Sequence, residues 1–220
     1  NQSKKDYQFK APVTAWDASG GKAHWRQREG DQPFFAVFNI TGTHESGTFP
    51  NRRRAPKVAD PAMVPVPPYY PDTPRVRADI ARTYDNIVAM DGRVGQLMKQ
   101  LTDDGLLENT IVVFFSDHGV GLPRGKRSIY DSGTRVPLII RWPDGRQAGT
   151  VDGRPVAFVD FAPTTLSIAE VEVPEYMQGQ VFAGPDAEKP KSHVFINADR
   201  MDSVTDRTRA VTDGRYRYVR

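Results

Sequence analysis

Two short, uninterrupted apolar runs constrain the fold of this chain more than any other feature of its 220 residues. The first covers Phe34–Ile40, between Pro33 and Gly42, and the second covers Ile111–Ser116. A strand with one solvated face alternates apolar and polar residues, whereas a strand covered on both faces is apolar throughout. The two runs therefore predict buried strands in a mostly parallel or mixed sheet that is flanked by helices.

The segments around these runs predict the other elements of the first two thirds. Seven prolines between residues 56 and 74 exclude regular structure and predict a long extended loop. Apolar residues at helical spacing predict a helix over Arg77–Leu101. A third strand is expected over Val136–Arg141, and Asp160 is expected to cap a short helix over Phe161–Ala169.

An antiparallel piece is expected at the C-terminus. His193–Asn197 has the pattern of a strand, and Arg207–Thr212 and Arg215–Arg220 flank Asp213-Gly214, a strong hairpin signal. The order of elements predicts an α/β fold followed by the start of a small antiparallel C-terminal subdomain. We expect residues 1–171 to belong to the main domain and residues 172–220 to form a linker and the beginning of that subdomain.

Composition excludes several classes of protein. Hydrophobic residues make up 38% of the chain, and 30 Lys and Arg against 27 Asp and Glu leave a formal charge of +3. A surplus this small does not indicate a nucleic-acid partner, and no apolar run approaches the roughly 18 residues of a membrane span. Because the chain has no cysteine, disulfides, thiolate metal sites and a cysteine nucleophile are excluded for these residues.

The strongest chemical signal is Ser116-Asp117-His118-Gly119, which directly follows the second apolar run. In open α/β sheets, ligands collect at the carboxyl ends of strands. An adjacent carboxylate and imidazole can both turn toward one cation, so Asp117 and His118 are candidate metal ligands, and Gly119 permits a sharp exit from the pair. The alternative is structural, with Asp117 capping the loop and His118 lying at the surface.

Two further candidates concern anion binding. Arg124, Lys126 and Arg127 place three cations within ten residues of Asp117, a grouping that suits a sulfate or phosphate held by a metal and cationic side chains. A solvated basic loop is the alternative. His44 lies just past the first apolar run, and it converges with Asp117 if the two strands are neighbours in the sheet. An ordinary loop histidine is the alternative there.

Taken together and in this order, these segments resemble the sulfatases of the alkaline-phosphatase-like superfamily. The resemblance rests on a strand that ends in an active-site histidine, a long helix, a second metal motif, and a sulfate-binding lysine with the strand after it. These stretches are Phe34–His44, Tyr84–Gly95, Asn109–Gly119, and Gly125-Lys126 with Gly133–Ile140. Arg209–Arg220 is similar to the opening of the family's C-terminal subdomain, and Val66–Pro74 most resembles members similar to heparan N-sulfatase (sulfamidase).

The resemblance implies a hydrolase that acts on a sulfuric ester or sulfamate, in a sulfated carbohydrate or a small sulfate ester. In the family, a formylglycine hydrate attacks sulfur while a divalent cation clamps the sulfate oxygens. Carried over, Asp117 and His118 are metal ligands, and Lys126 and His44 hold the sulfate near the leaving atom, which His44 can protonate. We expect calcium from the resemblance. Many sulfatases carry Asn in place of His118, and its imidazole nitrogen suits zinc or manganese better.

The family's first strand, with its paired metal-binding aspartates, and its Cys/Ser-x-Pro-x-Arg nucleophile motif precede the region seen here. Neither a cysteine nor a Ser-x-Pro-x-Arg occurs in the sequence. We therefore expect residues 1–171 to be a partial catalytic domain that is inactive alone, with the formylglycine upstream. No signal segment is present in these residues, and a periplasmic, secreted or lysosomal location is expected from the family.

Two other functions stay open. The phosphatase branch of the superfamily also uses an Asp-His pair, which allows a phosphodiesterase or phosphomonoesterase with a Ser or Thr nucleophile upstream. The other is a non-catalytic domain that binds sulfated polysaccharide through Arg52–Arg54 and the Lys126 loop. That function predicts salt-sensitive binding without turnover.

Overall fold

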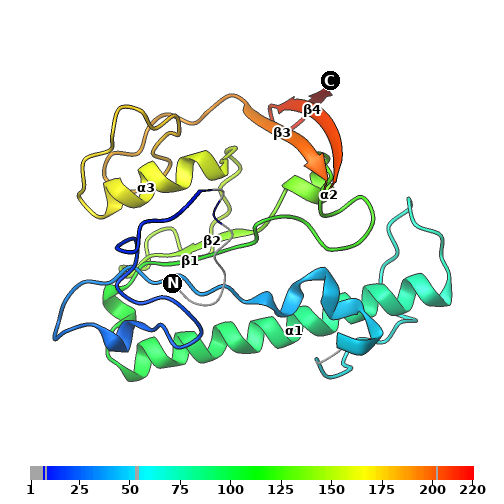
Figure 1. Ribbon diagram of the computed structural model, residues 1–220, viewed down its shortest axis with the longest axis horizontal. Helices are drawn as coiled ribbons and strands as arrows, with labels where there is room; N and C mark the ends of the chain where they lie inside the picture. Colours follow the sequence, from blue (N-terminus) through cyan, green and yellow to red (C-terminus); the bar gives the residue numbers. More distant parts are fainter. Residues whose placement is uncertain (1–6, 8, 53–54, 202) are drawn as a thin grey trace. The chain divides into compact units, whose positions relative to one another are not determined.

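The computed structural model describes residues 7, 9–52, 55–201 and 203–220. The chain divides into two compact units, Asn1–Asp103 and Asp104–Arg220, which are described one at a time. Figure 1 shows the elements of both units, coloured along the sequence. The boundary expected between residues 171 and 172 stays a prediction.

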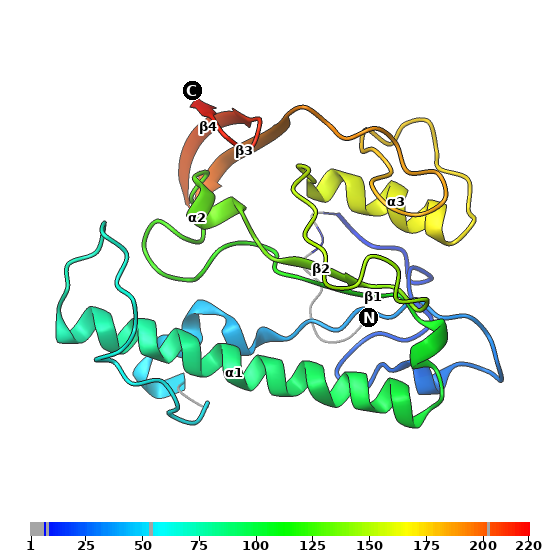
Figure 2. The same ribbon diagram turned by 180° about the vertical axis from the view of Figure 1, so that it is seen from behind.

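One long helix, α1 (Pro74–Asp103), dominates the first unit and confirms the helix expected over residues 77–101. It begins at the last of the seven loop prolines, whose fixed φ and missing N–H suit the first helical turn. Both ribbon views show α1 as one continuous element with the proline-rich loop at its N-terminal end (Figures 1 and 2). Among the residues described before it, the chain forms four short 3-10 helices: η1 (Trp25–Gln27), η2 (Thr41–Thr43), η3 (Glu45–Thr48) and η4 (Pro50–Arg52).

Polar side chains of α1 hold the beginning of the proline-rich loop. Asp85 is buried, and its carboxylate accepts hydrogen bonds from the backbone N–H groups of Val58 and Ala59 at 2.7 and 2.8 Å. Arg82, also buried, donates to the carbonyl of Ala55 at 2.6 Å and lies 3.5 Å from the Asp85 carboxylate. These bonds satisfy backbone groups that the prolines keep out of regular structure. The helix therefore orders the loop through its polar face.

Arg77 holds the rest of the same loop. Its guanidinium donates to the carbonyls of Pro61, Ala62 and Val64 at 3.0 to 3.3 Å. It also makes two hydrogen bonds to the Asp72 carboxylate, at 2.5 and 2.7 Å, which hold the pKa of that carboxyl below its ordinary value. A single side chain thus ties both the middle and the end of the loop to the first turn of α1.

The strand expected over Phe34–Ile40 is wrong. Only Phe38 takes part in a β-bridge, and no residue of the run is buried. Its aromatic rings instead pack on the buried Trp25, which stacks with Phe34 at a centroid distance of 5.9 Å and meets Phe38 edge-on at 5.5 Å. Ring packing can hold an apolar run extended without the backbone partners that a sheet supplies, so apolar continuity alone does not establish a strand.

In the second unit, β1 (Val112–Phe115) and β2 (Leu138–Arg141) confirm the strands expected over residues 111–116 and 136–141. The two strands pair antiparallel, with Val112 opposite Arg141 and Phe115 opposite Leu138. Parallel pairing is therefore not found among the strands of the described residues. Phe115 packs against Phe161, the first residue of helix α3 (Phe161–Ile168), at a centroid distance of 5.0 Å.

The antiparallel piece expected at the C-terminus is confirmed as a three-stranded sheet. It consists of β3 (Val194–Met201), β4 (Val204–Thr212) and β5 (Arg217–Val219), with β4 in the middle. The Asp213 carboxylate organises the β4–β5 turn by accepting from the backbone N–H groups of Arg215 and Tyr216 at 2.8 and 2.6 Å. These bonds lower the pKa of Asp213. Gly214 supplies the left-handed conformation that the turn needs.

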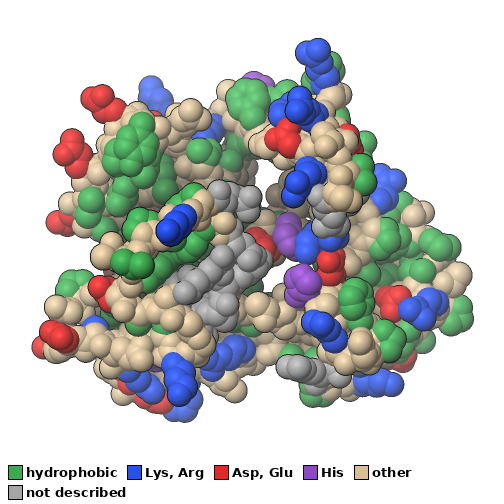
Figure 3. Space-filling view, viewed as in Figure 1, with side chains coloured by type: hydrophobic (Ala, Val, Ile, Leu, Met, Phe, Trp, Pro, Cys, Tyr) green, Lys and Arg blue, Asp and Glu red, His purple; other side chains and the backbone are tan. Residues whose placement is uncertain are grey.

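Charged side chains of both signs lie on the face of the protein that Figure 3 draws. On the face drawn in Figure 3, basic and acidic side chains lie interspersed among hydrophobic ones, in keeping with the small net charge of +3. Within the described residues, no helix combines the length and apolarity needed to cross a bilayer.

Asp160 precedes α3, but the expected cap is wrong. Its backbone is already helical, and its side chain makes no capping bond to the helix. The carboxylate is only 1% exposed, and it accepts from the backbone N–H groups of Ala157 and Gln180, each at 2.9 Å, and from Lys191 Nζ at 2.5 Å. The side chain joins three segments far apart in sequence, which no local pattern could indicate.

We expect Asp160→Asn to lower the free energy of unfolding by about 3 kcal/mol, because it leaves Lys191 without its charged partner in a mostly buried setting. Urea denaturation measures the change. Asp152→Asn is the matched control, because it removes an exposed pair with Arg154 and should cost less than about 1 kcal/mol. Equal losses in the two variants would contradict the role given to Asp160.

Candidate active site in the loop between β1 and β2

Three of the four predicted site residues lie in one loop of the second unit. Asp117 and His118 follow the end of β1, and Lys126 lies further along the same connection to β2. The segment contains the single-turn helix α2 (Asp131–Thr134). His44 lies in the first unit, between η2 and η3. Its convergence with Asp117 stays a prediction, and of the two strands on which it was based only β1 is formed.

The Asp-His end of the loop is fixed by backbone contact with α2. The N–H of Gly119 donates to the carbonyl of Gly133 at 2.9 Å. A Cβ at Gly119 would lie only 1.8 Å from the carbonyl oxygen of Ser132, a separation that real Cβ atoms do not show. Gly119 is not among the residues with positive φ. It is therefore needed for close approach, rather than for the sharp turn that the sequence suggested.

The Lys126 end of the loop is packed in the same way. The N–H of Lys126 donates to the carbonyl of Val120 at 2.7 Å, and a Cβ at Gly125 would lie 2.2 Å from that same oxygen. A Cβ at Gly133 would lie 2.1 Å from the carbonyl oxygen of Ser128. Gly133 thus contacts both ends of the loop, so the metal-ligand candidates and the lysine belong to one packed backbone structure.

The hydrogen bond made by His118 assigns its tautomer. Its Nδ1 lies 2.8 Å from the carbonyl oxygen of Gly119. A carbonyl only accepts, so Nδ1 carries the proton and Nε2 keeps its lone pair in the neutral ring. This is the arrangement of a metal-bound histidine, in which a backbone carbonyl orients the ring through the other nitrogen.

His44 shows the opposite arrangement. Its Nδ1 accepts from the backbone N–H of Ser46 at 3.2 Å and lies 2.9 Å from the Ser46 hydroxyl. Because Nδ1 is an acceptor, the proton of the neutral ring lies on Nε2. The neutral His44 ring is therefore suited to donate a hydrogen bond through Nε2, whereas His118 is suited to coordinate through Nε2.

The donor set fits part of a metal shell. His118 Nε2 lies 3.6 Å from Asp117 Oδ1, a separation that allows both atoms to bind one cation. The side chains are 34% and 63% exposed. Among the described residues, no group of three or more His, Cys, Asp or Glu gathers as a complete site. The pair could thus supply two ligands, and the assignment stays a prediction.

The basic segment of the loop lines an open cavity of about 470 Å³, formed by residues 121–124 and 126–128. Arg124 and Arg127 both have positive φ, at 64° and 73°. The left-handed conformation costs a side-chain-bearing residue roughly 1–2 kcal/mol, and such strain concentrates at functional sites. Arg124 also lies over the Tyr130 ring at 5.7 Å.

The other basic candidate is Arg52–Arg54. Two of its three residues, Arg53 and Arg54, lie outside the described residues.

Sequence reasoning missed α2 and the residues that hold it. The contacts of Gly133 with both ends of the loop and of Arg217 with α2 join positions far apart in the chain. The glycines at 119, 125 and 133 were a visible signal. Their meaning as points of backbone contact emerges only in three dimensions.

Comparison with known proteins identifies the family of the chain. The sulfatase family model matches residues 22–171, and the model of the C-terminal domain of N-sulphoglucosamine sulphohydrolase matches residues 123–220. An ulvan-active sulfatase of Formosa agariphila is 46% identical and covers 100% of this chain and 43% of the relative. The N-sulphoglucosamine sulphohydrolase of Homo sapiens is 35% identical and covers 66% of this chain and 29% of the relative. The chain thus spans less than half the length of these relatives.

A solved structure supports the fold. The phosphonate monoester hydrolase of Silicibacter pomeroyi has a TM-score of 0.54 and 22% sequence identity, covering 80% of this chain and 39% of that one. At this identity the likeness concerns the fold alone, and it confirms the α/β class expected from the order of elements. The resemblance to sulfatases, including heparan N-sulfatase-like members, is likewise confirmed by the family models.

We expect Gly119→Ala to destabilise the protein by about 1–3 kcal/mol, because a methyl group there overlaps the Ser132 carbonyl. Gly153→Ala is the control. Gly153 lies in the same unit, its φ is not positive, and a Cβ added to it would meet no atom within 4 Å. The stability of this control should be unchanged or slightly raised. Thermal unfolding of both variants checks this, and a neutral Gly119→Ala would argue against the tight backbone contact.

Proposed function

Because the chain belongs to the sulfatase family, we propose that it is the central and C-terminal part of a sulfatase that hydrolyses a sulfate ester or sulfamate of a sulfated carbohydrate. The observation that carries the proposal is the geometry of the Asp117–His118 pair, in which the Gly119 carbonyl orients the imidazole so that Nε2 keeps its lone pair 3.6 Å from the Asp117 carboxylate. The names of two relatives, an ulvan-active sulfatase and an N-sulphoglucosamine sulphohydrolase, support a carbohydrate substrate.

Asp117 and His118 would hold a divalent cation, which in the family neutralises the sulfate oxygens and polarises sulfur. The family favours calcium, whereas the imidazole nitrogen of His118 suits zinc or manganese. The remaining ligands and the formylglycine nucleophile are proposed to lie in the part of the relatives that this chain does not match. A periplasmic, secreted or lysosomal location belongs to the same proposal and rests on the family alone.

Lys126 and His44 are proposed to act on the sulfate and the leaving atom. Cleavage of the bond to sulfur moves negative charge onto the leaving oxygen or nitrogen. The Lys126 ammonium stabilises that charge and the sulfate oxygens, and the His44 Nε2–H would supply a hydrogen bond to the leaving atom, or a proton when the ring is an imidazolium. The rigid loop around Lys126 supports this role, because a preorganised cation needs no reorganisation during the reaction.

We expect Lys126→Ala in the complete protein to lower kcat/KM for a sulfate ester roughly 100–1,000-fold, through loss of charge stabilisation. Lys99→Ala is the matched control, because Lys99 is an exposed α1 lysine paired with Asp103. The kcat/KM of this variant should stay within about twofold of the wild-type value. Assays run in parallel on the sulfate ester and the corresponding phosphate ester. An unchanged rate would remove Lys126 from the site, and activity on the phosphate ester alone would contradict a sulfatase.

We expect His118→Asn to weaken zinc and manganese binding at least roughly tenfold, because a nitrogen ligand is replaced by a weak oxygen donor. Calcium binding should be retained. Metal content after dialysis against each ion, measured by elemental mass spectrometry, checks this directly. His193→Asn is the control, since His193 is an exposed histidine of the same unit. Unchanged zinc and manganese affinity in His118→Asn would exclude His118 as a ligand.

A further inference from the structure

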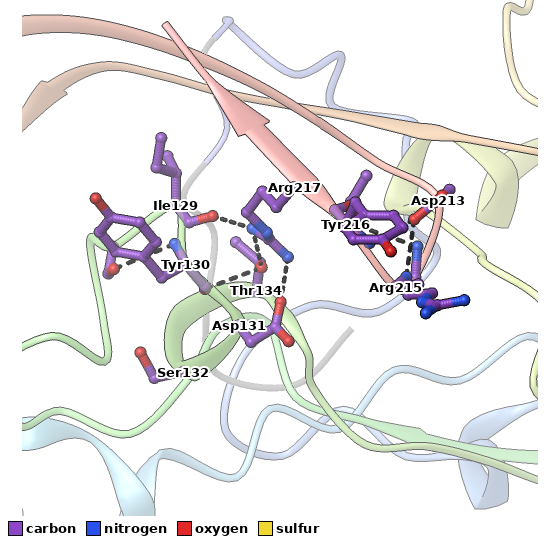
Figure 4. A network of polar contacts seen from close by, with 12 residues as sticks. Ile129, Tyr130, Asp131, Ser132, Thr134, Asp213, Arg215, Tyr216 and Arg217 are labelled. Atoms are coloured by element: carbon purple, nitrogen blue, oxygen red, sulfur yellow. Dashed lines mark hydrogen bonds and ion pairs between the residues drawn. The ribbon is translucent and has the colours of Figure 1, made fainter. Parts of the chain in front are cut away.

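The C-terminal sheet sends one arginine into the loop that carries the candidate site. Arg217 of β5 is mostly buried, with its side chain 15% exposed. One guanidinium nitrogen donates to the carbonyl of Ile129 and to Thr134 Oγ1, the latter at 3.1 Å, and the other forms an ion pair with Asp131. Figure 4 shows the guanidinium reaching these partners around α2. The chain just before α2 and both ends of α2 are thus linked to a single side chain.

Helix α2 in turn contacts both functional parts of the loop. On the metal side, the carbonyl of Gly133 accepts from the N–H of Gly119, the residue after His118. On the lysine side, the Ser132 hydroxyl donates to the carbonyl of Arg124, two residues before Lys126. A displacement of α2 would therefore move both the Asp-His pair and the lysine.

We propose that Arg217 is a positioning residue for the sulfate site, holding α2 so that Lys126 and His118 keep their places. The inference rests on the proposed function and extends it to the C-terminal sheet, which contains none of the candidate site residues. Arg217 acts through α2 and does not itself touch the substrate.

The chemistry of the contact suits this role. A planar guanidinium can bond two or three acceptors in fixed directions, whereas a lysine ammonium is a single point charge on a flexible stem. Burial strengthens these bonds, because water competes less for the donors. Catalysis is sensitive to such support, since a displacement of about 1 Å at a reacting group can cost roughly 100-fold in rate.

The test compares Arg217→Gln, Arg217→Lys and Thr134→Val in the complete protein with the matched control Arg209→Gln. Arg209 lies in the same C-terminal sheet and forms an ion pair with Asp199. Arg209→Gln therefore removes the same charge as Arg217→Gln, but at a position whose ion pair does not involve α2. Thr134→Val deletes one acceptor of Arg217 with nearly the same shape, and it also removes the hydrogen bond from the Thr134 hydroxyl to the carbonyl of Tyr130. Hydrogen exchange of residues 117–134 reports the loop independently of activity, and kcat and KM for a sulfate ester report the site.

We expect Arg217→Gln to speed exchange of the loop amides at least roughly tenfold and to lower kcat/KM roughly 10–100-fold. Arg217→Lys and Thr134→Val should give smaller changes of the same kind, and Arg209→Gln should change neither quantity. Unchanged loop exchange in folded Arg217→Gln would overturn the inference, as would faster exchange with an unchanged rate. If Arg217→Gln does not fold, Arg217→Lys decides in the same way, because it keeps the charge and loses the bonds to separate acceptors. Failure of the proposed function gives a different result: the wild-type protein is inactive on the sulfate ester, although its loop amides exchange slowly.

Discussion

The candidate site depends on direct contact between backbones in the loop that joins β1 to β2. Carbonyl groups lie where side chains at Gly119 and Gly133 would otherwise be, so the loop packs without intervening atoms. Such contacts leave little room for adjustment, since nothing flexible separates the two chain segments. The loop can therefore hold the backbone at Asp117, His118 and Lys126 in place, although much of it lies outside helices and strands.

Buried or mostly buried polar side chains hold several irregular segments of the chain in place through hydrogen bonds. Asp85 orders the proline-rich loop, Asp160 joins three segments of the second unit, and Arg217 links the C-terminal sheet to α2. Each bonds backbone groups that no helix or strand satisfies. A buried backbone N–H or C=O group is costly to leave without a hydrogen bond. These side chains therefore determine the path of loops whose conformation is not set by helix or strand propensity.

The sequence predicted the elements that have a local signature. The helical spacing before Leu101, the apolar runs at β1 and β2, and the Asp213-Gly214 turn all gave correct elements. Phe34–Ile40 failed because its apolar pattern is equally satisfied by rings packing on Trp25. The chemistry of Asp117 and His118 was visible as a motif, but the tautomer of His118 depends on a carbonyl whose position no spacing reveals.

The bond from Arg217 to α2 also bears on how such a protein can be divided or recombined. The C-terminal family model begins at residue 123, ahead of Lys126, and continues through β5. Loop and sheet are thus matched by one family model, even though they lie far apart in the chain. A hybrid that takes its C-terminal sheet from another family member should take residues 123–134 from the same parent, because the arginine and its acceptors form a single unit of exchange.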